Sequence, residues 1–549
     1  MKHSDQNISI QHSKNISEYL KINAEKFPDK PALLHPVRIT YKELEAEVNR
    51  YSFGLQNAGI KPGSLTILMI PAGAGFFIFT FALLRIGAVP VMIDPGMGIK
   101  AMSKALAGVK ADAFIGIPKA HLLKLFHPSA LENVKTRIVT GLPWFFGGLR
   151  LKEILKYKEG KYPSYPVGDN HVAAIFFTSG STGPAKGVIY TTGMLNAQIQ
   201  VTKSQFNIGS DEVDLCTFPL LGLFAICHGN SSVIADMDMV HPAKLNPAVV
   251  IKNIHDFSCT QMFGSPMILD RLSKYGSVNG IKLFSLRRII TAGAPVHRNV
   301  LESFNQLIAE DARIHIPYGA TEVLPVTDIN ASERLQSGSD ETENENGICI
   351  GYPLKGLDVK IIEITDNQIL SWNDAIQMPV NEIGEIVVKG PWVTTEYFNN
   401  KYATGLSKIT DSSDKSIWHR MGDLARIDGL GRLWFYGRKS QRVITAAGTL
   451  LTIPCEAVFN RYPRVVRSAL VGIPGNVSGL NKPVICIQLE TGTHPTKKLI
   501  QELLELGDGS KMTKGISDIL FFDKFPVDPR HNAKIFREKL AIWAKRRIK

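Results

Sequence analysis

The chain has 549 residues, of which 44% are hydrophobic and 21% are charged, and its formal net charge is +13. This is an ordinary globular composition, and the length exceeds one typical core, so we expect at least two folded units. The six cysteines are scattered without a close pair, which excludes a disulfide framework and a zinc site. The polar segment 1–13 lacks the apolar core of a signal peptide, so the sequence predicts a cytoplasmic protein.

The positive charge is concentrated in the last fifth of the chain. From Gly437 onward there are 20 Lys and Arg residues against 9 Asp and Glu residues. Such a region can serve an anionic small molecule, a membrane surface or a nucleic acid. Aromatic residues are not interleaved with these charges and no nucleic-acid-binding motif is present, so we expect no nucleic acid partner. Contact with a membrane surface stays open.

Helix-like and strand-like segments alternate along the first half of the chain. The pattern predicts a helix over 40–58 and strands over 65–71, 88–94, 111–117, 172–178 and 286–293. This alternation is typical of layered α/β architecture with largely parallel sheets. The apolar stretch 76–93 contains Arg85, Gly87 and Pro90, so it predicts a buried helix followed by a buried strand and no transmembrane segment.

The pattern changes after a polar, acidic stretch at 331–346, which we interpret as an exposed loop. Strands are then expected over 356–364, 384–390 and 431–437. These strands predict a β-rich subdomain of about 347–436.

The segment Gly-Arg-Lys-Ser-Gln-Arg at 437–442 mixes glycine and charge between two apolar runs and is interpreted as a hinge. The sequence therefore predicts an α/β protein (α+β overall) with a large N-terminal domain (1–436). A small, mobile α+β domain (443–549) follows the hinge.

A stretch rich in glycine and hydroxyl groups, FFTSGSTGPAKGVIYTT, runs from Phe176 to Thr192. Glycines let backbone N–H groups approach an oxyanion, hydroxyls donate hydrogen bonds, and a lysine supplies charge. The stretch is therefore a candidate phosphate site. Its candidate binding residues are Thr178, Ser179, Gly180, Ser181, Thr182, Gly183 and Lys186.

This loop differs from the usual P-loop, in which the lysine and a following Ser or Thr open a helix. Lys186 is instead followed by Gly187 and a β-branched run, so we expect the loop to join two strands. A flexible Ser/Gly hairpin is the alternative, but Pro184 and the apolar flanks favour a shaped turn.

Four other stretches place polar side chains or glycines at the ends of apolar runs. They are TAGAPV (291–296), IPYGATEVLP (316–325), HRMGDLARIDGLGRLWFYGRK (419–439) and VDPRHNAKIFREKL (527–540). Each is weak evidence alone, because a single GATE is usually a turn and a single lysine near a chain end is usually solvated.

In this order, the five stretches resemble the adenylate-forming superfamily of acyl-CoA synthetases, peptide-synthetase adenylation domains and luciferases. The resemblance covers about 16–539 and implies that the chain uses ATP and Mg²⁺. It implies that the 178–186 loop, with Lys186, holds the β- and γ-phosphates. It also implies that the adenine pocket is lined by Gly293, Ala294, Pro295 and Tyr318, and that Gly319 and Ala320 belong to the ATP-binding residues.

The same resemblance implies roles for the remaining polar residues. Thr321 would hydrogen-bond the α-phosphate, and Glu322, a hard oxygen ligand, would hold Mg²⁺. Asp423 would accept the ribose hydroxyls, with Arg438 beside it. Lys534 would swing in from the C-terminal domain and bridge the substrate carboxylate and the α-phosphate.

Two departures from the superfamily pattern concern the step after acyl-AMP formation. Gly222 and Leu223 lie where many relatives have a histidine or an aromatic residue. The hinge reads Gly437-Arg438-Lys439-Ser440-Gln441, without the usual acidic residue. Because relatives rotate about that hinge between adenylation and thioester formation, this change puts the CoA half-reaction in doubt.

A narrower resemblance, to the β-lactone synthetases of bacterial long-chain olefin biosynthesis, accommodates both departures. It is carried by PLLGLF (219–224), MFGSPMILDRL (262–272), GRKSQRV (437–443), TIPCE (452–456) and DPRHNAKI (528–535). It implies adenylation of a 2-alkyl-3-hydroxy fatty acid, attack of the 3-hydroxyl on the activated carbonyl, and no CoA. A β-lactone decarboxylase and a reductase would be the implied pathway partners.

Other interpretations remain at this stage. The first is a medium- or long-chain acyl-CoA synthetase, or an acyl-AMP ligase that serves a carrier protein. The second is a catalytically inactive scaffold, against which the intact polar residues argue. The segments 218–226 and 262–269 are candidates for an acyl pocket or for ordinary core. His228, His241 and His315 are candidates by residue type alone for the base that would activate the hydroxyl.

Overall fold

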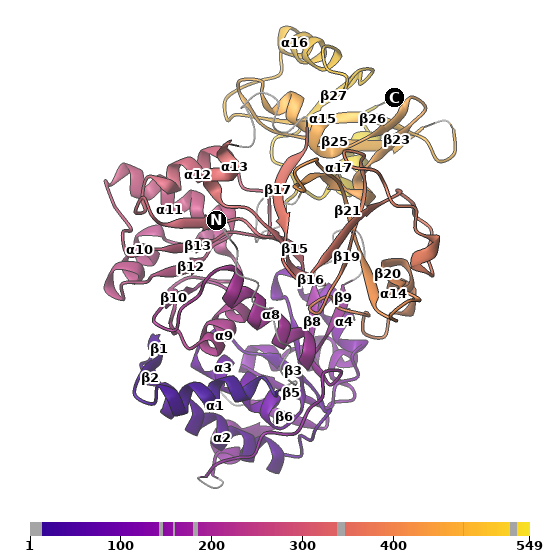
Figure 1. Cartoon of the computed structure of the whole chain (residues 1–549). Helices are drawn as coiled ribbons and strands as arrows, with labels where there is room; N and C mark the ends of the chain where they lie inside the picture. The colour runs from indigo at the N-terminus through magenta and orange to yellow at the C-terminus, as the bar shows by residue number, and fades with distance from the viewer. Residues whose placement is uncertain are drawn as a thin grey trace.

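The computed structural model describes residues 14–141, 147–156, 160–178, 185–336, 346–475, 477–527 and 535–548. The chain forms two mainly parallel sheets, a mainly antiparallel sheet and a smaller C-terminal unit. The first two sheets occupy the lower and left parts of Figure 1, and the C-terminal unit forms the top.

The first parallel sheet confirms the N-terminal α/β prediction. Its strand order is β7-β6-β5-β3-β4-β8-β9, and only β8 and β9 pair antiparallel. The strands are β3 (Leu65–Met69), β4 (Val89–Ile93), β5 (Ala113–Gly116), β6 (Thr136–Val139), β7 (Leu149–Arg150), β8 (Val172–Thr178) and β9 (Lys186–Thr191). The associated helices are α1 (Ser17–Lys26), α2 (Tyr41–Asn57), α3 (Ala74–Arg85), α4 (Ile99–Ala107), α5 (Pro118–His121), α6 (Leu123–Phe126), α7 (Leu151–Ile154) and α8 (Thr192–Gln205).

The second sheet has the order β14-β13-β12-β10-β11-β1-β2 and is parallel except at its β1–β2 edge. Its strands are β1 (Pro31–His35), β2 (Ile39–Thr40), β10 (Val213–Cys216), β11 (Ser231–Ile234), β12 (Gln261–Phe263), β13 (Arg288–Ile290) and β14 (Arg313–His315). Its helices are α9 (Pro219–His228), α10 (Pro247–Asp256), α11 (Pro266–Val278) and α12 (Arg298–Asn305).

Helix α3 confirms the prediction that the apolar stretch after residue 75 is a buried helix. Every residue from Phe76 to Arg85 is buried, and β4 follows directly as the predicted strand. The helix has 12 residues, whereas about 20 are needed to cross a bilayer. Within the part of the chain that the structure describes, no helix is both long enough and apolar enough to span a membrane.

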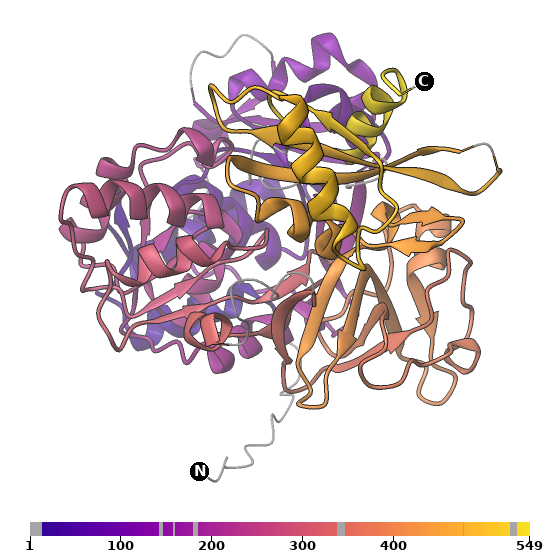
Figure 2. The same ribbon diagram turned by 90° about the horizontal axis from the view of Figure 1, so that it is seen from above.

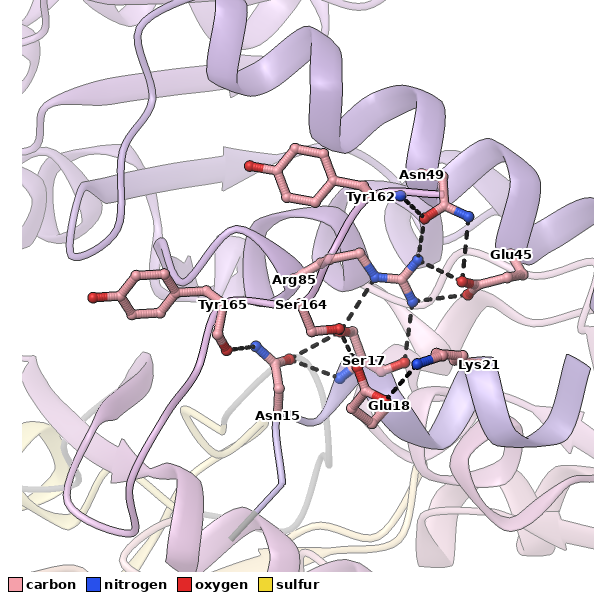
Figure 3. A network of polar contacts seen from close by, with 10 residues as sticks. All are labelled: Asn15, Ser17, Glu18, Lys21, Glu45, Asn49, Arg85, Tyr162, Ser164 and Tyr165. Atoms are coloured by element: carbon pink, nitrogen blue, oxygen red, sulfur yellow. Dashed lines mark hydrogen bonds and ion pairs between the residues drawn. The ribbon is translucent and has the colours of Figure 1, made fainter. Parts of the chain in front are cut away.

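Arg85 is 0% exposed and fixes the packing of the N-terminal helices (Figure 3). Its Nη1 and Nη2 atoms lie 2.7 Å from the two carboxylate oxygens of Glu45 on α2. Nη1 also donates to Asn49 Oδ1 at 2.8 Å, and Nη2 donates to the Ser17 carbonyl on α1 at 3.2 Å. Its buried charge is therefore paired and hydrogen-bonded, as a stable core requires.

We expect Arg85→Met to lower the free energy of unfolding by about 3–5 kcal/mol, because the change leaves the Glu45 carboxylate uncompensated. Urea unfolding followed by circular dichroism measures the loss. Arg50→Met is the matched control on α2, since Arg50 makes a partly exposed 2.6 Å pair with Glu47 and loss of such a pair costs about 0–1 kcal/mol. Equal effects of the two substitutions would contradict the assignment of Arg85 as a structural centre.

The β-rich part is one mainly antiparallel sheet of order β15-β16-β17-β22-β21-β19-β18, with β20 paired to β21. Its strands are β15 (Tyr318–Ala320), β16 (Val323–Asp328), β17 (Ile348–Pro353), β18 (Asp358–Ile362), β19 (Gly384–Lys389), β20 (Lys408–Thr410), β21 (Ile417–Ile427) and β22 (Leu433–Arg438). Helix α14 (Lys401–Ser407) lies beside β20. The sheet therefore begins with the GATE segment (319–322). This lies upstream of residue 347, where the sequence predicted the β-rich subdomain to start.

The prediction of an exposed loop over 331–346 was wrong for its first six residues. Residues Ala331–Gln336 form helix α13, in which Ala331 is buried in the core of the second sheet and Leu335 packs against it. Asn330 Oδ1 accepts the Glu333 N–H at 2.9 Å and starts the helix. The rest of the predicted loop, up to residue 345, lies outside the described residues.

The C-terminal unit contains the sheet β25-β26-β27 and the hairpin β23-β24. The strands are β23 (Val443–Thr445), β24 (Gly448–Leu450), β25 (Val465–Pro474), β26 (Asn481–Leu489) and β27 (Asp518–Phe521), and the helices are α15 (Thr452–Asn460), α16 (Lys497–Asp508) and α17 (Arg537–Lys545). This unit lies nearest the viewer in Figure 2, over the other sheets. A short turn, Lys439–Gln441, connects β22 to it.

Candidate active site

The predicted adenine-binding segments lie at one edge of the second sheet. Gly293, Ala294 and Pro295 follow β13, and Tyr318 follows β14, its neighbouring parallel strand. The carboxyl ends of parallel strands are the usual position of ligand sites in such sheets. Gly293 and Pro295 are exposed, and Gly293 has φ +95°, which favours glycine.

Tyr318, Asp423 and Arg438 form a polar cluster on the β-rich sheet. The pairing of β21 with β22 places Asp423 opposite Arg438. Tyr318 Oη donates to Asp423 Oδ2 at 2.5 Å, and Arg438 Nη1 lies 3.2 Å from Oδ1. Burial raises the pKa of Asp423, against the opposing effects of Arg438 and Tyr318. Burial, followed by the nearby Asp423 charge, also raises the pKa of Tyr318.

This cluster fits a nucleotide ribose. Asp423 is 2% exposed, and its Oδ1 atom has no hydrogen-bond partner among the described residues, because the Arg438 contact is not aligned as a hydrogen bond. A buried carboxylate oxygen without a donor has capacity for a ligand hydroxyl. The ring of Tyr318, 6.2 Å from that of Phe435, is half-buried and available for stacking.

Glu322 and Lys186 both contact the side chain of Tyr397. Glu322 follows Thr321 in the turn between β15 and β16, where a Cβ on Gly319 would lie only 2.6 Å from the Val323 carbonyl oxygen. Tyr397 Oη donates to Glu322 Oε1 at 2.6 Å, and the Lys186 Nζ lies 4.8 Å from the Tyr397 ring centroid. Burial, then the Glu322 charge, raises the pKa of Tyr397 far above its usual value, so the phenol stays a donor.

Tyr397 reaches this position because its segment docks on β9. The Phe398 N–H donates to the Gly187 carbonyl at 2.7 Å, and Val188 and Tyr397 form an isolated antiparallel bridge. The β8–β9 pairing confirms that the glycine-rich loop joins two strands, with Thr178 opposite Lys186. The first sheet and the β-rich sheet therefore both contribute to the cluster around Glu322.

The donor set around Glu322 is compatible with a magnesium ion that also binds substrate phosphates. No group of three or more His, Cys, Asp or Glu side chains suited to a metal occurs within the described ranges. Mg²⁺ is commonly held by one or two carboxylates plus substrate phosphates and waters. Glu322 provides one such carboxylate. The neighbouring Lys186 provides a positive charge that can bind the phosphates.

Several predicted residues cannot be placed. Ser179, Gly180, Ser181, Thr182, Gly183 and Lys534 lie outside the described residues, as does the side chain of Thr178. Conversely, sequence reasoning missed Tyr397 and its neighbours Thr394 and Lys408. Their only sequence signal was the aromatic pair Tyr397-Phe398 among polar residues after the strand ending at Lys389.

An apolar cavity extends along α9 from the same sheet edge. Leu221, Phe224, Ala225 and His228 line it from one helix face, and Phe263, Ile290, Ala292, Pro317 and Leu324 complete much of its wall. Both predicted acyl-pocket segments, 218–226 and 262–269, thus contribute residues to a cavity.

The three histidines considered as bases have different surroundings. His228 lines the cavity; burial lowers its pKa to about 4, and its Nε2 lies 2.9 Å from the Ile199 carbonyl. His241 is exposed and pairs with Asp238 at 2.8 Å, and His315 pairs with Asp328 at 2.7 Å. A histidine with so low a pKa is a weak base, and neither His241 nor His315 lines the cavity, so none of the three is assigned as the base.

A model of the family described as "AMP-binding enzyme" matches residues 20–398. This chain belongs to that family. It is 39% identical to proteins named olefin beta-lactone synthetase from Stenotrophomonas maltophilia and Xanthomonas campestris, over 96% of this chain and 98% and 97% of theirs. A 4-coumarate–CoA ligase of Humulus lupulus is 22% identical over 96% of this chain and 94% of its own. The chain is therefore an AMP-forming ligase that activates its substrate as an adenylate.

Solved structures of adenylate-forming ligases share the fold. The amide bond synthetase McbA of Marinactinospora thermotolerans superposes with a TM-score of 0.77 at 20% identity, covering 96% of this chain and 99% of that one. The anthranilate CoA ligase AuaEII, in complex with anthranoyl-AMP, has a TM-score of 0.78 at 18% identity and covers 100% and 99%. These comparisons confirm the predicted fold class and family, and members of the AMP-binding family use ATP.

We expect Asp423→Asn to weaken ATP binding about 10- to 100-fold, because hydrogen bonds to charged groups contribute about 1.5–3 kcal/mol each. Isothermal titration calorimetry measures the change. Asp428→Asn is the matched control at the end of the same hairpin, where Asp428 binds Arg432 and Trp434. ATP binding that is unchanged in Asp423→Asn, or equally weakened in Asp428→Asn, would remove Asp423 from the nucleotide site.

Proposed function

We propose that this protein activates a fatty acid bearing a 3-hydroxyl, preferably a 2-alkyl-3-hydroxy acid, and closes the acyl-AMP to a β-lactone. The observation that carries the proposal is the 39% identity, across nearly the whole chain, to two proteins named olefin beta-lactone synthetase. A β-lactone decarboxylase and a reductase would then act on the product in the same pathway. This chemistry is compatible with a protein that works in the bulk cytoplasm and with one that works at a membrane surface.

The apolar cavity supports a fatty substrate. Its wall combines residues from α9 and β12 with Ala292 and Pro317, which lie next to the proposed adenine-binding segments. An acyl chain along α9 would place its carboxylate toward the turn that carries Thr321 and Glu322. Ligand pockets of this kind are mostly apolar with a few polar groups that fix orientation.

The proposed first step uses the polar clusters described above. Tyr318 and Asp423 hold the nucleoside, the 178–186 loop with Lys186 holds the β- and γ-phosphates, and Thr321 holds the α-phosphate. Glu322 would bind Mg²⁺, which supplies charge neutralisation when bound. A carboxylate oxygen attacks the α-phosphorus as the bond to pyrophosphate breaks, and Lys534 offsets the charge that develops. Proximity contributes strongly, because two anions must meet.

In the proposed second step, the 3-hydroxyl oxygen attacks the acyl carbonyl carbon. The carbonyl–AMP bond breaks as the ring C–O bond forms, AMP leaves, and the hydroxyl proton is released. The nucleophile is already attached to the substrate, so no second substrate has to enter.

The hinge residue Lys439 is anchored to the N-terminal part of the chain. Lys439, near the place where many relatives have an acid, donates to Glu385 at 2.9 Å and to the Thr365 carbonyl at 2.9 Å. Glu385 is buried and also pairs with Arg420. We propose that 1–436 and 443–549 act as separate domains about the 437–442 hinge, with Lys439 anchored to the larger one.

The second candidate function is that of an acyl-CoA synthetase, or of an acyl-AMP ligase that serves a carrier protein. The full-length match to a 4-coumarate–CoA ligase favours it, although the identity is only 22%. Under this alternative, the acyl group would pass from AMP to a thiol, and CoA would be required for turnover.

The proposal predicts different pyrophosphate release from two matched acids in the absence of CoA. A 2-alkyl-3-hydroxy acid should turn over continuously. The same acid without the 3-hydroxyl should give only a burst equal to the enzyme concentration, because its adenylate has no internal nucleophile. A coupled pyrophosphate assay distinguishes the two. Continuous turnover of both acids, only once CoA is added, would favour the second candidate.

Lys534→Ala should slow acyl-AMP formation by about 10²- to 10³-fold, the usual cost of removing one group that stabilises transition-state charge. ATP binding should stay nearly intact, because Lys534 is expected to act on the reacting atoms. Single-turnover formation of acyl-AMP measures the rate, and Lys539→Ala, an exposed lysine of α17, is the control. A wild-type rate in Lys534→Ala would show that the assignment is wrong.

A further inference from the structure

Lys408 is a buried lysine behind the Glu322 cluster. It begins β20, is 7% exposed, and donates from Nζ to the carbonyl oxygen of Thr394 and to its Oγ1, the latter at 3.2 Å. No carboxylate forms an ion pair with it in the part of the chain that the structure describes. Burying an ammonium group without a carboxylate partner is costly, so its presence calls for an explanation beyond packing.

The first contact of Lys408 leads to the backbone of Glu322. Thr394 is 0% exposed. Its N–H and its Oγ1 donate to the Glu322 carbonyl oxygen at 2.9 Å and 3.0 Å. Lys408 therefore orders the residue that fixes the peptide of Glu322.

The second contact leads to the side chain of Glu322. The Lys408 Nζ lies 5.8 Å from the centroid of the Tyr397 ring, within cation–π range, and the Lys186 Nζ lies 4.8 Å from the same centroid. The hydroxyl of this ring holds Glu322 Oε1 at 2.6 Å. Two lysines thus contact the tyrosine that orients the carboxylate.

Electrostatics connects the same groups. Burial lowers the pKa of Lys408 to about 7, while Glu322 acts in the opposite direction and Lys186 adds to the lowering. The pKa of Lys408 is thus influenced by Glu322 and Lys186 as well as by burial.

We propose that Lys408 is a positioning residue for the magnesium and phosphate end of the site, which holds Glu322 through Thr394 and Tyr397. The inference rests on the proposed role of Glu322 as the magnesium ligand. Lys408 would not contact the metal or the phosphates itself. Groups that orient a metal ligand typically change metal affinity or activity about 10- to 100-fold when they are removed.

The test measures binding, not turnover. α,β-Methylene-ATP, which cannot be cleaved between its α- and β-phosphorus atoms, is titrated calorimetrically into the full-length protein with Mg²⁺ or with EDTA. We expect Lys408→Met to reduce the Mg²⁺-dependent gain in affinity by about 10- to 100-fold. Binding in EDTA, which depends on adenine and ribose contacts, should be unchanged.

Three further variants make the result specific. Lys408→Arg should retain part of the Mg²⁺-dependent gain in affinity that Lys408→Met loses. Lys408→Gln, which keeps a hydrogen-bond donor without the charge, replaces Lys408→Met in the test if Lys408→Met does not fold. Lys389→Met is the matched control, because Lys389 lies in the same sheet near Trp418 but pairs with Asp411 and Asp414. It should keep the full gain even where its melting temperature falls.

Two results would overturn the inference, and they differ in what else they affect. A folded Lys408 variant with the wild-type Mg²⁺-dependent gain, beside a Glu322→Gln variant that has lost the gain, would refute the role of Lys408 and leave the proposed site intact. A full gain in Glu322→Gln would refute the magnesium assignment itself and the inference with it.

Discussion

The site depends on two carboxylates that are each held by a tyrosine hydroxyl. Tyr318 donates to Asp423, and Tyr397 donates to Glu322. A phenol is a neutral donor, so it orients a carboxylate without cancelling its charge. An arginine fork would instead neutralise the carboxylate. Burial raises the pKa of both tyrosines and keeps them protonated. Asp423 Oδ1, which has Arg438 3.2 Å away but no hydrogen-bond donor among the described residues, can accept from a ribose hydroxyl, and Glu322 offers a carboxylate to a cation.

This arrangement requires two sheets, the first parallel sheet and the β-rich sheet, to pack against each other. Asp423 comes from β21, Glu322 from the turn after β15, and Lys186 from β9 of the first sheet. The segment around Tyr397 crosses between them, because it belongs to the β-rich region and bonds to Gly187 on β9. The Arg85 network acts at a distance from this site: it fixes helices α1, α2 and α3 against one another and so supports the first sheet (Figure 3).

Local sequence pattern was sufficient for much of the fold. The strands β3, β4, β5 and β8 were predicted because each is an apolar run between turn residues, and α2 was predicted from its helical pattern over 40–58. The structure adds a capping box of Thr40 and Glu43 at the start of α2. The loop prediction at 331–336 failed because a polar sequence became a helix once Ala331 and Leu335 could pack on a distant core. Tertiary contact decided that segment, and no local pattern carries such information.

The residues of the site fall into the same two groups: those that the sequence indicated, and those that only tertiary contact brings together. Glu322 and Asp423 lie in short motifs that carry the resemblance to the adenylate-forming superfamily, so the resemblance indicated them. Thr394, Tyr397 and Lys408 are adjacent to Glu322 only because β20 and the preceding segment fold back against the β15–β16 turn. Tyr397 and Glu322 are separated by 75 residues, so their contact depends on the whole β-rich sheet. Residues that act through long-range packing cannot be derived from spacing.

The central claim is that the activated acid reacts with its own 3-hydroxyl. The most direct measurement is proton NMR of the products formed from ATP, Mg²⁺ and a 2-alkyl-3-hydroxy fatty acid, without CoA. The account predicts β-lactone ring signals that grow in proportion to AMP. It would be contradicted if AMP appeared only after CoA was added and the acyl group was recovered as a thioester.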